Sequence, residues 1–385
     1  MTSDEPTGAS ARRDESHTIW FAGGGTGGHL YPGLAIARAL VRLTPTWTPF
    51  FIGAQRGIER TILPHCEFPH MLLDLHPLYR RTPWNNWHTV VGAISAWRAL
   101  SRKAEHERPT AVVGTGGYAA GVALAWARAH GVPTILHEPD SHPGLTTRAF
   151  AGGANAIYLG FPEALASLST KTGSDVQALG APIEPPPRAR STAEQARAKW
   201  KLPVDAFVVL CVGGSQGAKA LNDTMATWCQ TGLPAGVALI WATGTAQASA
   251  FFAHESPMVR VRSYLMPIAE AYAAADLAVT RAGAMTIAEL CAWGIPSVLV
   301  ALPTAAQNHQ THNAQAVALA GAAIALPQSE LSVARLERIV GELREAPARL
   351  SAMHSAAIGR AKPHAADDIA AAIQRNLLNT KHFLK

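Results

Sequence analysis

The sequence has few cysteines and few charged residues. Four cysteines occur in 385 residues, and Asp, Glu, Lys and Arg together make up only 16% of the chain. The cysteines lie far apart, without a Cys-x-x-Cys pair or a Cys/His ligand spacing, so neither a zinc site nor a disulfide framework is indicated. We expect small buried hydrophobic side chains at these positions, which are Cys66, Cys211, Cys229 and Cys291.

We expect neither an export signal nor a membrane span in this chain. Residues 1–16 are polar and charged, which predicts a flexible tail on a cytosolic protein. The longest uncharged stretch, residues 110–127, contains four glycines, so a strand, a turn and a buried helix are favoured over a membrane span. No cluster of carboxylates suggests a metal, and we predict no cofactor.

What the chain does have is a large hydrophobic fraction and an excess of positive charge. Hydrophobic residues make up 48% of the 385 residues, which predicts a globular protein with two domains. The net charge of +6 predicts a basic surface and an acidic partner. Nucleic acid, anionic lipid and nucleotide phosphates all fit that description.

Short β-branched or aromatic segments alternate with segments of helical periodicity, which is typical of right-handed βαβ units in parallel sheets. We predict strands at residues 19–22, 48–52, 111–113, 134–136, 156–159, 207–212, 237–242, 277–280 and 297–300. The proline-rich residues 181–188 can continue neither a sheet nor a helix, which indicates a linker. The fold class is therefore α/β, with two doubly wound domains at residues 17–182 and 183–364 and a C-terminal helix, within 365–385, packed back on the first domain.

Three glycine-rich turns each follow a predicted strand and open a segment of helical periodicity. They lie at residues 23–28, 114–117 and 213–217. Backbone N–H groups at such a helix start can bind phosphate or another anion. Two turns in the first half and one past the middle predict two nucleotide-fold halves around a shared cleft.

Two polar segments of the second half could recognise a sugar nucleotide. Glu289 follows a small-residue turn at a helix start, and its carboxylate could accept hydrogen bonds from the vicinal hydroxyls of a ribose. A solvated helix residue is the alternative. Residues 303–313 supply amides and imidazoles after a buried strand, which suits sugar hydroxyls, although a polar first turn of a helix would look the same.

Motifs in a fixed order run through nearly the whole chain. They are Gly24-Gly25-Thr26-Gly27-Gly28-His29, Gly116-Gly117-Tyr118, His137-Glu138, Gly213-Gly214-Ser215-Gln216-Gly217-Ala218, Arg281-Ala282-Gly283-Ala284-Met285-Thr286 with Glu289, and Gln310 with Asn313-Ala314. In this order they closely resemble the MurG family, which moves N-acetylglucosamine from UDP onto undecaprenyl-pyrophosphoryl-N-acetylmuramoyl-pentapeptide.

This resemblance implies a glycosyltransferase B fold, with two Rossmann-like domains facing a cleft and no metal. It implies a peripheral protein at the cytoplasmic face of the inner membrane, with no nucleic acid as partner. The product, lipid II, would place the chain in peptidoglycan synthesis, and so in cell-wall biogenesis, cell shape and cell division.

The resemblance also implies a donor site formed mainly by the second domain. Ser215 and its glycine turn would hold the pyrophosphate, Glu289 would bind the ribose, and the backbone of Leu265 would meet the uracil. Gln310 would bind the N-acetylglucosamine hydroxyls. Further donor contacts are implied at Thr26, Gly27, Gly28, Ala284, Met285, Thr286, Ile287 and Ala288.

The acceptor's pyrophosphate would face the first domain across the cleft. The implied loops contain Gly24, Gly25, Gly116, Gly117 and Tyr118. The acceptor's 4-hydroxyl attacks an α-linked sugar to give a β-linkage, and this inverting displacement needs a base and stabilisation of the departing UDP.

His29 is the first candidate for a catalytic role. It stands at a helix start, where the helix dipole favours the neutral imidazole that can accept a proton. Ordering the loop or positioning the substrate is the alternative, and His137 and Glu138 are further candidates.

Two positions depart from the family pattern. The chain has Pro139-Asp140 where the family has an asparagine at the second position, and Glu184 where the family has a hinge arginine that reaches a donor phosphate. A carboxylate there would repel the pyrophosphate. Either another cation substitutes, with Arg281 the nearest by motif, or the donor binds more weakly.

One segment of the first half interleaves aromatic, aliphatic and cationic residues. Trp84 and Trp87 follow Arg80 and Arg81, a combination that suits the interface of an anionic bilayer. We therefore expect a membrane-binding segment here. A buried amphipathic helix with a solvated edge is the alternative.

Other functions remain to be weighed against transfer. An epimerase acting on UDP-N-acetylglucosamine would keep the fold and donor site without a lipid-facing segment, and a non-catalytic UDP-sugar-binding protein is a third possibility. A nicotinamide-dependent oxidoreductase would need an acid after the second strand, where this chain has Ala54-Gln55-Arg56.

Overall fold

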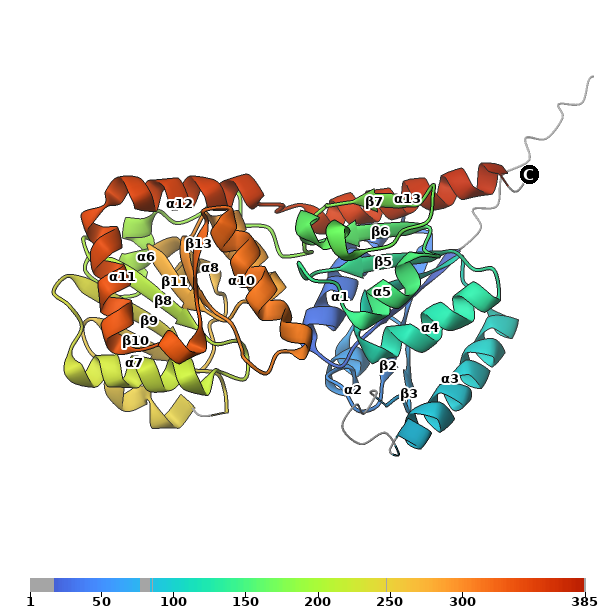
Figure 1. Cartoon of the computed structure of the whole chain (residues 1–385), viewed down its shortest axis with the longest axis horizontal. Coiled ribbons are helices and arrows are strands. Elements are labelled where there is room, and N and C mark those ends of the chain that lie inside the picture. Colours follow the sequence, from blue (N-terminus) through green and yellow to red (C-terminus); the bar gives the residue numbers. More distant parts are fainter. Residues whose placement is uncertain (1–16, 77–83, 85, 247, 384–385) are drawn as a thin grey trace, which may run out of the picture.

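The computed structural model describes residues 17–76, 84, 86–246 and 248–383, and the predicted tail at 1–16 lies outside this range. Two α/β domains lie side by side, each built on one parallel sheet (Figure 1). The predicted α/β fold with two doubly wound domains is thereby confirmed.

The first domain has a seven-stranded sheet in the order β3-β2-β1-β4-β5-β6-β7. Its strands are β1 (His17–Gly23), β2 (Trp47–Ala54), β3 (His70–Leu73), β4 (Ala111–Gly116), β5 (Thr134–Glu138), β6 (Ala156–Leu159) and β7 (Asp175–Gln177). Its helices are α1 (Gly27–Leu43), α2 (Glu59–Ile62), α3 (Asn86–His106), α4 (Gly117–Ala129) and α5 (Leu145–Ala151).

The second domain has a six-stranded sheet in the order β10-β9-β8-β11-β12-β13. Its strands are β8 (Phe207–Val212), β9 (Val237–Ala242), β10 (Val259–Arg262), β11 (Leu277–Thr280), β12 (Ser297–Val300) and β13 (Ala323–Leu326). Its helices are α6 (Ala193–Lys199), α7 (Lys219–Thr231), α8 (Ala269–Ala274), α9 (Ala284–Trp293), α10 (His309–Leu319), α11 (Val333–Glu345) and α12 (Pro347–Arg360).

Both sheets reverse their strand order at one point, and the glycine turns lie there. In the first sheet the reversal falls between β1 and β4, and in the second between β8 and β11. Open α/β sheets bind ligands outside the carboxyl ends of the strands at this switch point. Helices α1 and α4 begin at the first switch point, and α7 and α9 begin at the second.

Helix α13 (Ala365–Phe383) crosses from the second domain back onto the first (Figure 1). There it packs against α1. Ile369 and Ile373 are fully buried in the same hydrophobic cluster as Leu34 of α1. Polar contacts fix the same pair of helices, since the Arg42 guanidinium donates to Asp367 at 2.7 Å. The last helix thus completes the core of the first domain.

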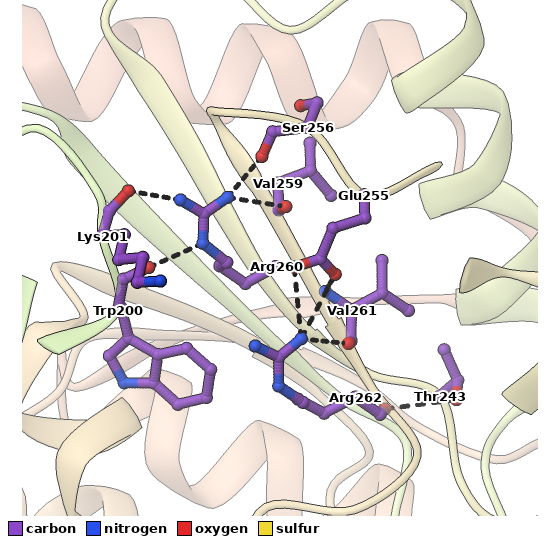
Figure 2. Close-up of polar contacts among 9 residues, drawn as sticks. All are labelled: Trp200, Lys201, Thr243, Glu255, Ser256, Val259, Arg260, Val261 and Arg262. Atoms are coloured by element: carbon purple, nitrogen blue, oxygen red, sulfur yellow. Dashed lines mark hydrogen bonds and ion pairs between the residues drawn. The ribbon is translucent and has the colours of Figure 1, made fainter. Parts of the chain in front are cut away.

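Each of the nine predicted strands is present, whereas the four edge strands β3, β7, β10 and β13 were not predicted. On the edge strand β10, polar contacts of arginine side chains fix the strand to the rest of the domain (Figure 2). The buried Arg260 guanidinium donates to the carbonyls of Trp200 at 2.6 Å and Val259 at 3.2 Å, and also to those of Lys201 and Ser256. This tertiary network ties β10 to the end of α6.

The expectation of four buried cysteines is only half correct. Cys211 and Cys291 are buried, whereas Cys66 and Cys229 are partly exposed. Cys66 follows a short 3-10 helix, and Cys229 packs against the core from the last turn of α7 without being fully covered. Among the described helices, none is both long and apolar enough to cross a membrane.

Candidate functional site

A pocket of the second domain lies at its switch point and has a volume of about 610 Å³. It is formed by the turn after β8, the first turns of α7 and α9, and the segment before α10. The lining residues used below are Gly217, Lys219, Arg281, Gly283, Thr286 and Gln310.

Two helices of the second domain begin at this pocket. The N-cap residues are Ala218 for α7 and Gly283 for α9, and neither supplies a side-chain hydrogen bond to its helix. The first N–H groups of both helices therefore have no intrahelical partner. Two helix N-termini with free donors form a site for an anion with more than one charged group.

The glycine turn beneath the pocket is held by close backbone contact. Gly217 has φ +79°, and a Cβ there would lie 2.1 Å from the Thr243 carbonyl oxygen. The fully buried Asn222 donates to that same carbonyl at 2.8 Å and accepts from the Trp241 indole at 3.0 Å. Arg262 supports the other side, since its carbonyl accepts from the Thr243 N–H at 2.9 Å (Figure 2). Sequence reasoning missed this support.

Arg281 is the cation best placed to serve the pocket. Its guanidinium donates to the carbonyls of Val300 at 3.2 Å and Ala301 at 3.3 Å, and burial lowers its pKa. Within the described residues it has no carboxylate at ion-pair distance. Lys219 is more exposed, and Asp223 pairs with it at 2.5 Å.

Glu289 lies on α9 and accepts a hydrogen bond from the Tyr272 hydroxyl at 2.7 Å. Burial raises the pKa of Glu289, and the charge of Glu184 raises it further. Glu184 itself is exposed. The departure at position 184 therefore acts electrostatically on the Glu289 side of the site.

The other predicted donor residues are only partly brought together. Thr286 and Gln310 line the pocket, and the Gln310 side chain accepts from the Leu302 N–H at 2.9 Å. Ser215 is exposed on the turn itself, and Leu265 is buried in the core. Ala284 and Met285 form the first turn of α9.

Ile287 and Ala288 face a different cavity. This cavity has a volume of about 350 Å³ and lies between the domains, where the chain crosses from one to the other. Arg360 of α12 also lines it and pairs with Glu163 of the first domain at 2.9 Å. These two predicted donor positions thus line a different cavity from Thr286 and Gln310.

The glycine turns of the first domain bond to their own domain. The Gly25 N–H donates to the Glu59 carboxylate at 2.7 Å, and the Gly24 N–H donates to the Gly116 carbonyl at 3.3 Å. The Thr26 side chain accepts from no backbone N–H of α1, so the N–H groups of Gly27 and Gly28 remain available within the described part of the chain. Tyr118 covers Gly25, where a Cβ would lie 3.0 Å from its ring.

His29 follows these free N–H groups on α1. Its Nδ1 lies 3.1 Å from the Gly24 carbonyl oxygen and 3.3 Å from the Thr26 hydroxyl. The hydroxyl can donate or accept, whereas the nearer carbonyl can only accept, so we assign the proton to Nδ1 and the lone pair to Nε2. Burial is the largest cause that lowers the pKa of His29, and the Gly24 bond and the charge of Asp140 offset part of it. The neutral form is thus favoured by burial, where the sequence suggested the helix dipole.

His137 and Glu138 are buried at the end of β5. Burial lowers the pKa of His137 to about 4 and raises that of Glu138 to about 7. The Glu138 carboxylate accepts from the N–H groups of Asp140 at 3.1 Å and Gly144 at 2.9 Å. Glu138 therefore shapes the loop before α5.

That loop binds the second domain through Asn313 of α10. The fully buried Asn313 amide donates to Asp140 at 2.7 Å and to the Ala282 carbonyl at 3.2 Å, and it accepts from the Ser141 N–H at 2.8 Å. Asp140, the other position that departs from the family pattern, thus lies at the domain interface. Nearby, the His142 and His312 rings stack with centroids 4.7 Å apart.

The predicted membrane segment is only partly described. Arg80 and Arg81 lie outside the described residues. Trp84 is 75% exposed and Trp87 60% exposed, before and at the start of α3. Three further apolar side chains of α3 are exposed, at Val90, Val91 and Ile94. No group of three or more His, Cys, Asp or Glu in the described part of the chain is arranged to hold a metal ion.

Comparison with known proteins yields family matches and relatives of nearly full length. The chain matches the glycosyltransferase family 28 N-terminal domain over residues 19–159 and the C-terminal domain of that family over residues 208–369. A relative from Moorella thermoacetica is 35% identical over 370 residues, covering 91% of this chain and 96% of the relative. It is named UDP-N-acetylglucosamine–N-acetylmuramyl-(pentapeptide) pyrophosphoryl-undecaprenol N-acetylglucosamine transferase.

Solved structures show the same architecture. MurG from Acinetobacter baumannii superposes with a TM-score of 0.75 at 26% identity, covering 94% of this chain and all of the other. CalG4, the calicheamicin glycosyltransferase, has a TM-score of 0.68 at 16% identity, covering 95% of this chain and 99% of the other. At that lower identity, the likeness concerns the fold alone.

Proposed function

The chain belongs to glycosyltransferase family 28, and we propose that it transfers N-acetylglucosamine from UDP-N-acetylglucosamine to a lipid-linked N-acetylmuramoyl-pentapeptide. The product is lipid II, the disaccharide precursor of peptidoglycan. The observation that carries this proposal is the convergence of α7 and α9 with Arg281 on one pocket.

That pocket suits the diphosphate of UDP. Free N–H groups at two helix starts and one guanidinium together oppose the charge that develops when the sugar leaves. In our proposal Arg281 replaces the hinge arginine that Glu184 has displaced. Glu289 binds the ribose, with Tyr272 orienting its carboxylate, and Gln310 binds the sugar hydroxyls.

His29 is the base in this mechanism. Its Nε2 takes the proton of the acceptor's 4-hydroxyl while that oxygen forms a bond to the anomeric carbon. The bond from the anomeric carbon to the UDP oxygen breaks on the opposite face, and its electrons stay on the diphosphate. The configuration inverts from α to β.

The acceptor's pyrophosphate binds to the first turn of α1. Gly24 and Gly25 already use their N–H groups within the domain, whereas Gly27 and Gly28 have theirs free. These α1 groups are therefore the anion-binding part of the loops assigned from the sequence.

The apolar face of α3 holds the enzyme at the cytoplasmic face of the membrane, where the lipid-linked acceptor lies. The exposed Trp84 and Trp87 support this, because indole rings favour the bilayer interface. Replacing both with serine should reduce co-sedimentation with anionic vesicles. Unchanged binding would remove α3 as the anchor.

The test of transfer is incubation with radiolabelled UDP-N-acetylglucosamine and a lipid-linked muramoyl-pentapeptide. We expect label in the lipid product. Release of an epimer without acceptor would favour an epimerase, and intact UDP binding without either product would favour a UDP-sugar-binding protein.

A further inference from the structure

A single peptide group of the first domain is held at both ends by ionisable side chains. The Gly25 N–H donates to Glu59 Oε1 at 2.7 Å. The Gly24 C=O accepts from His29 Nδ1–H at 3.1 Å. Since this C=O and this N–H belong to the same peptide, Glu59 and His29 are connected by one amide.

The surrounding backbone leaves room for the Glu59 carboxylate. Glu59 has no solvent exposure. A Cβ at Gly24 would lie 1.5 Å from its Oε1, and one at Gly57 would lie 1.8 Å from its Oε2. Oε2 is buried and has no hydrogen-bond partner among the described residues. The carboxylate thus makes its main contact through Oε1, with the Gly24–Gly25 peptide.

We propose that Glu59 is a positioning residue for His29 and acts through the Gly24–Gly25 peptide. A negative charge at the N–H end polarises the amide and makes its carbonyl a stronger acceptor. The stronger bond to Nδ1–H fixes the tautomer in which Nε2 has the lone pair. It also stabilises the imidazolium that forms when Nε2 takes a proton, as an orienting carboxylate does when it binds a catalytic histidine directly.

Several ionisable groups face His29, so the effect of Glu59 on the pKa of His29 must be separated from their effects. Asp140 approaches from the loop after β5, His309 from the start of α10, and His137 from β5. Of these groups, Glu59 alone is bound to the peptide that accepts from Nδ1. Glu59→Gln is the informative change, because the amide oxygen can still accept from Gly25 N–H while the charge is removed.

The test measures His29 directly in the full-length protein by ¹⁵N NMR of labelled histidine. The chain has 16 histidines, so the signals of His29 are assigned by their loss in His29→Asn. We expect the Nδ1–H tautomer in the wild type. In Glu59→Gln the pKa of His29 should fall by about half a unit or more, because a nearby carboxylate no longer stabilises the imidazolium.

The matched control is Glu67→Gln. Glu67 lies in the same domain and pairs with Arg38 at the surface at 2.6 Å, so this change alters the net charge equally and should leave the pKa of His29 unchanged. Glu59→Gln should also lower kcat about tenfold, with KM for UDP-N-acetylglucosamine nearly constant. In a plot of kcat against pH, the fall in kcat on the acidic side should move to lower pH, because the pKa of the base is lower.

The inference rests on the proposed role of His29 as base, but its test does not depend on activity. An equal pKa of His29 in folded Glu59→Gln and wild type would overturn it. If Glu59→Gln does not fold, the tautomer of His29 in the wild type tests the proposal. An Nε2–H form would overturn it, and an Nδ1–H form would support it. Full activity of His29→Asn would overturn the catalytic role of His29, but it would not affect the inference that Glu59 acts on His29 through the Gly24–Gly25 peptide.

Discussion

In the first domain the glycine turn after β1 closes on a carboxylate of its own domain, whereas in the second the turn after β8 opens onto a pocket of about 610 Å³. Both turns lie at the switch point of a parallel sheet with the same pattern of strand reversal. Topology therefore fixes where a ligand can bind, and the side chains near the turn decide what the site does. The Glu59 carboxylate binds an N–H group of the first turn, whereas Arg281 lines the pocket beside the second turn, where an anion can bind.

The largest effect that tests this division is expected from His29→Asn. In the proposed mechanism the base belongs to one domain and the diphosphate to the other, so this change should lower kcat by about 10²–10⁴-fold and leave UDP binding intact. Steady-state kinetics and calorimetric titration with UDP measure the two effects separately. A comparable loss of UDP affinity would contradict the division.

Glu138 should make the first domain less stable as pH rises. Burial raises its pKa in the folded state to about 7 from an ordinary value near 4.5, so the folded chain binds the proton more tightly. The stability that Glu138 contributes is complete below about pH 4.5 and is lost as the pH rises to about 7. This contribution to the free energy of unfolding is at most about 3 kcal/mol. Thermal unfolding of wild type and Glu138→Gln between pH 5 and 8 compares them, and parallel pH curves would refute the assignment.

Arg281→Gln should weaken UDP binding with little change in the chemistry at His29. Loss of one charge-assisted hydrogen bond costs about 1.5–3 kcal/mol, or roughly 10–150-fold in Kd. Lys219→Gln is the matched control, and its effect should be smaller because Asp223 already pairs with that exposed lysine. If Lys219→Gln has the larger effect, Arg281 is not the substitute for the hinge arginine.

The smallest effect is expected at the interface between the two domains. Asp140→Asn should change the free energy of unfolding by about 0.5 kcal/mol or less, since the new amide oxygen can still accept from Asn313. Asn313→Ala, in contrast, leaves Asp140 and the Ser141 N–H without their partner and should cost about 1–3 kcal/mol. Chemical denaturation of both variants gives the two values, and equal destabilisation would show that the contact depends on the charge of Asp140.

The central strands and the glycine turns could be predicted from the sequence because their signals are local. Strands such as β8 and β9 are buried on both faces and read as continuous apolar runs. The four strands that were missed are the edges, where segments such as His70–Leu73 and Asp175–Gln177 carry polar residues and depend on one neighbour. Their pairing depends on tertiary contacts.

The contacts that organise the site join residues far apart in sequence. Glu59 reaches Gly25 across 34 positions and Asn313 reaches Asp140 across 173, so no motif contains either pair. Motif order predicts roles for the turn after β8, for the start of α9 and for His29, and these roles stay predictions. Adjacency along α9 does not reveal that Ile287 and Ala288 line a different cavity from Thr286.

The return of α13 to the first domain has a consequence for the order of folding during synthesis. Ile369, Ile373 and Leu377 belong to the same buried cluster as Ile19 and Leu34, although more than three hundred residues separate them. A ribosome releases the whole second domain before it releases these side chains. The domain that is synthesised first therefore completes its core last, and until then the α1 surface that α13 covers remains exposed to solvent.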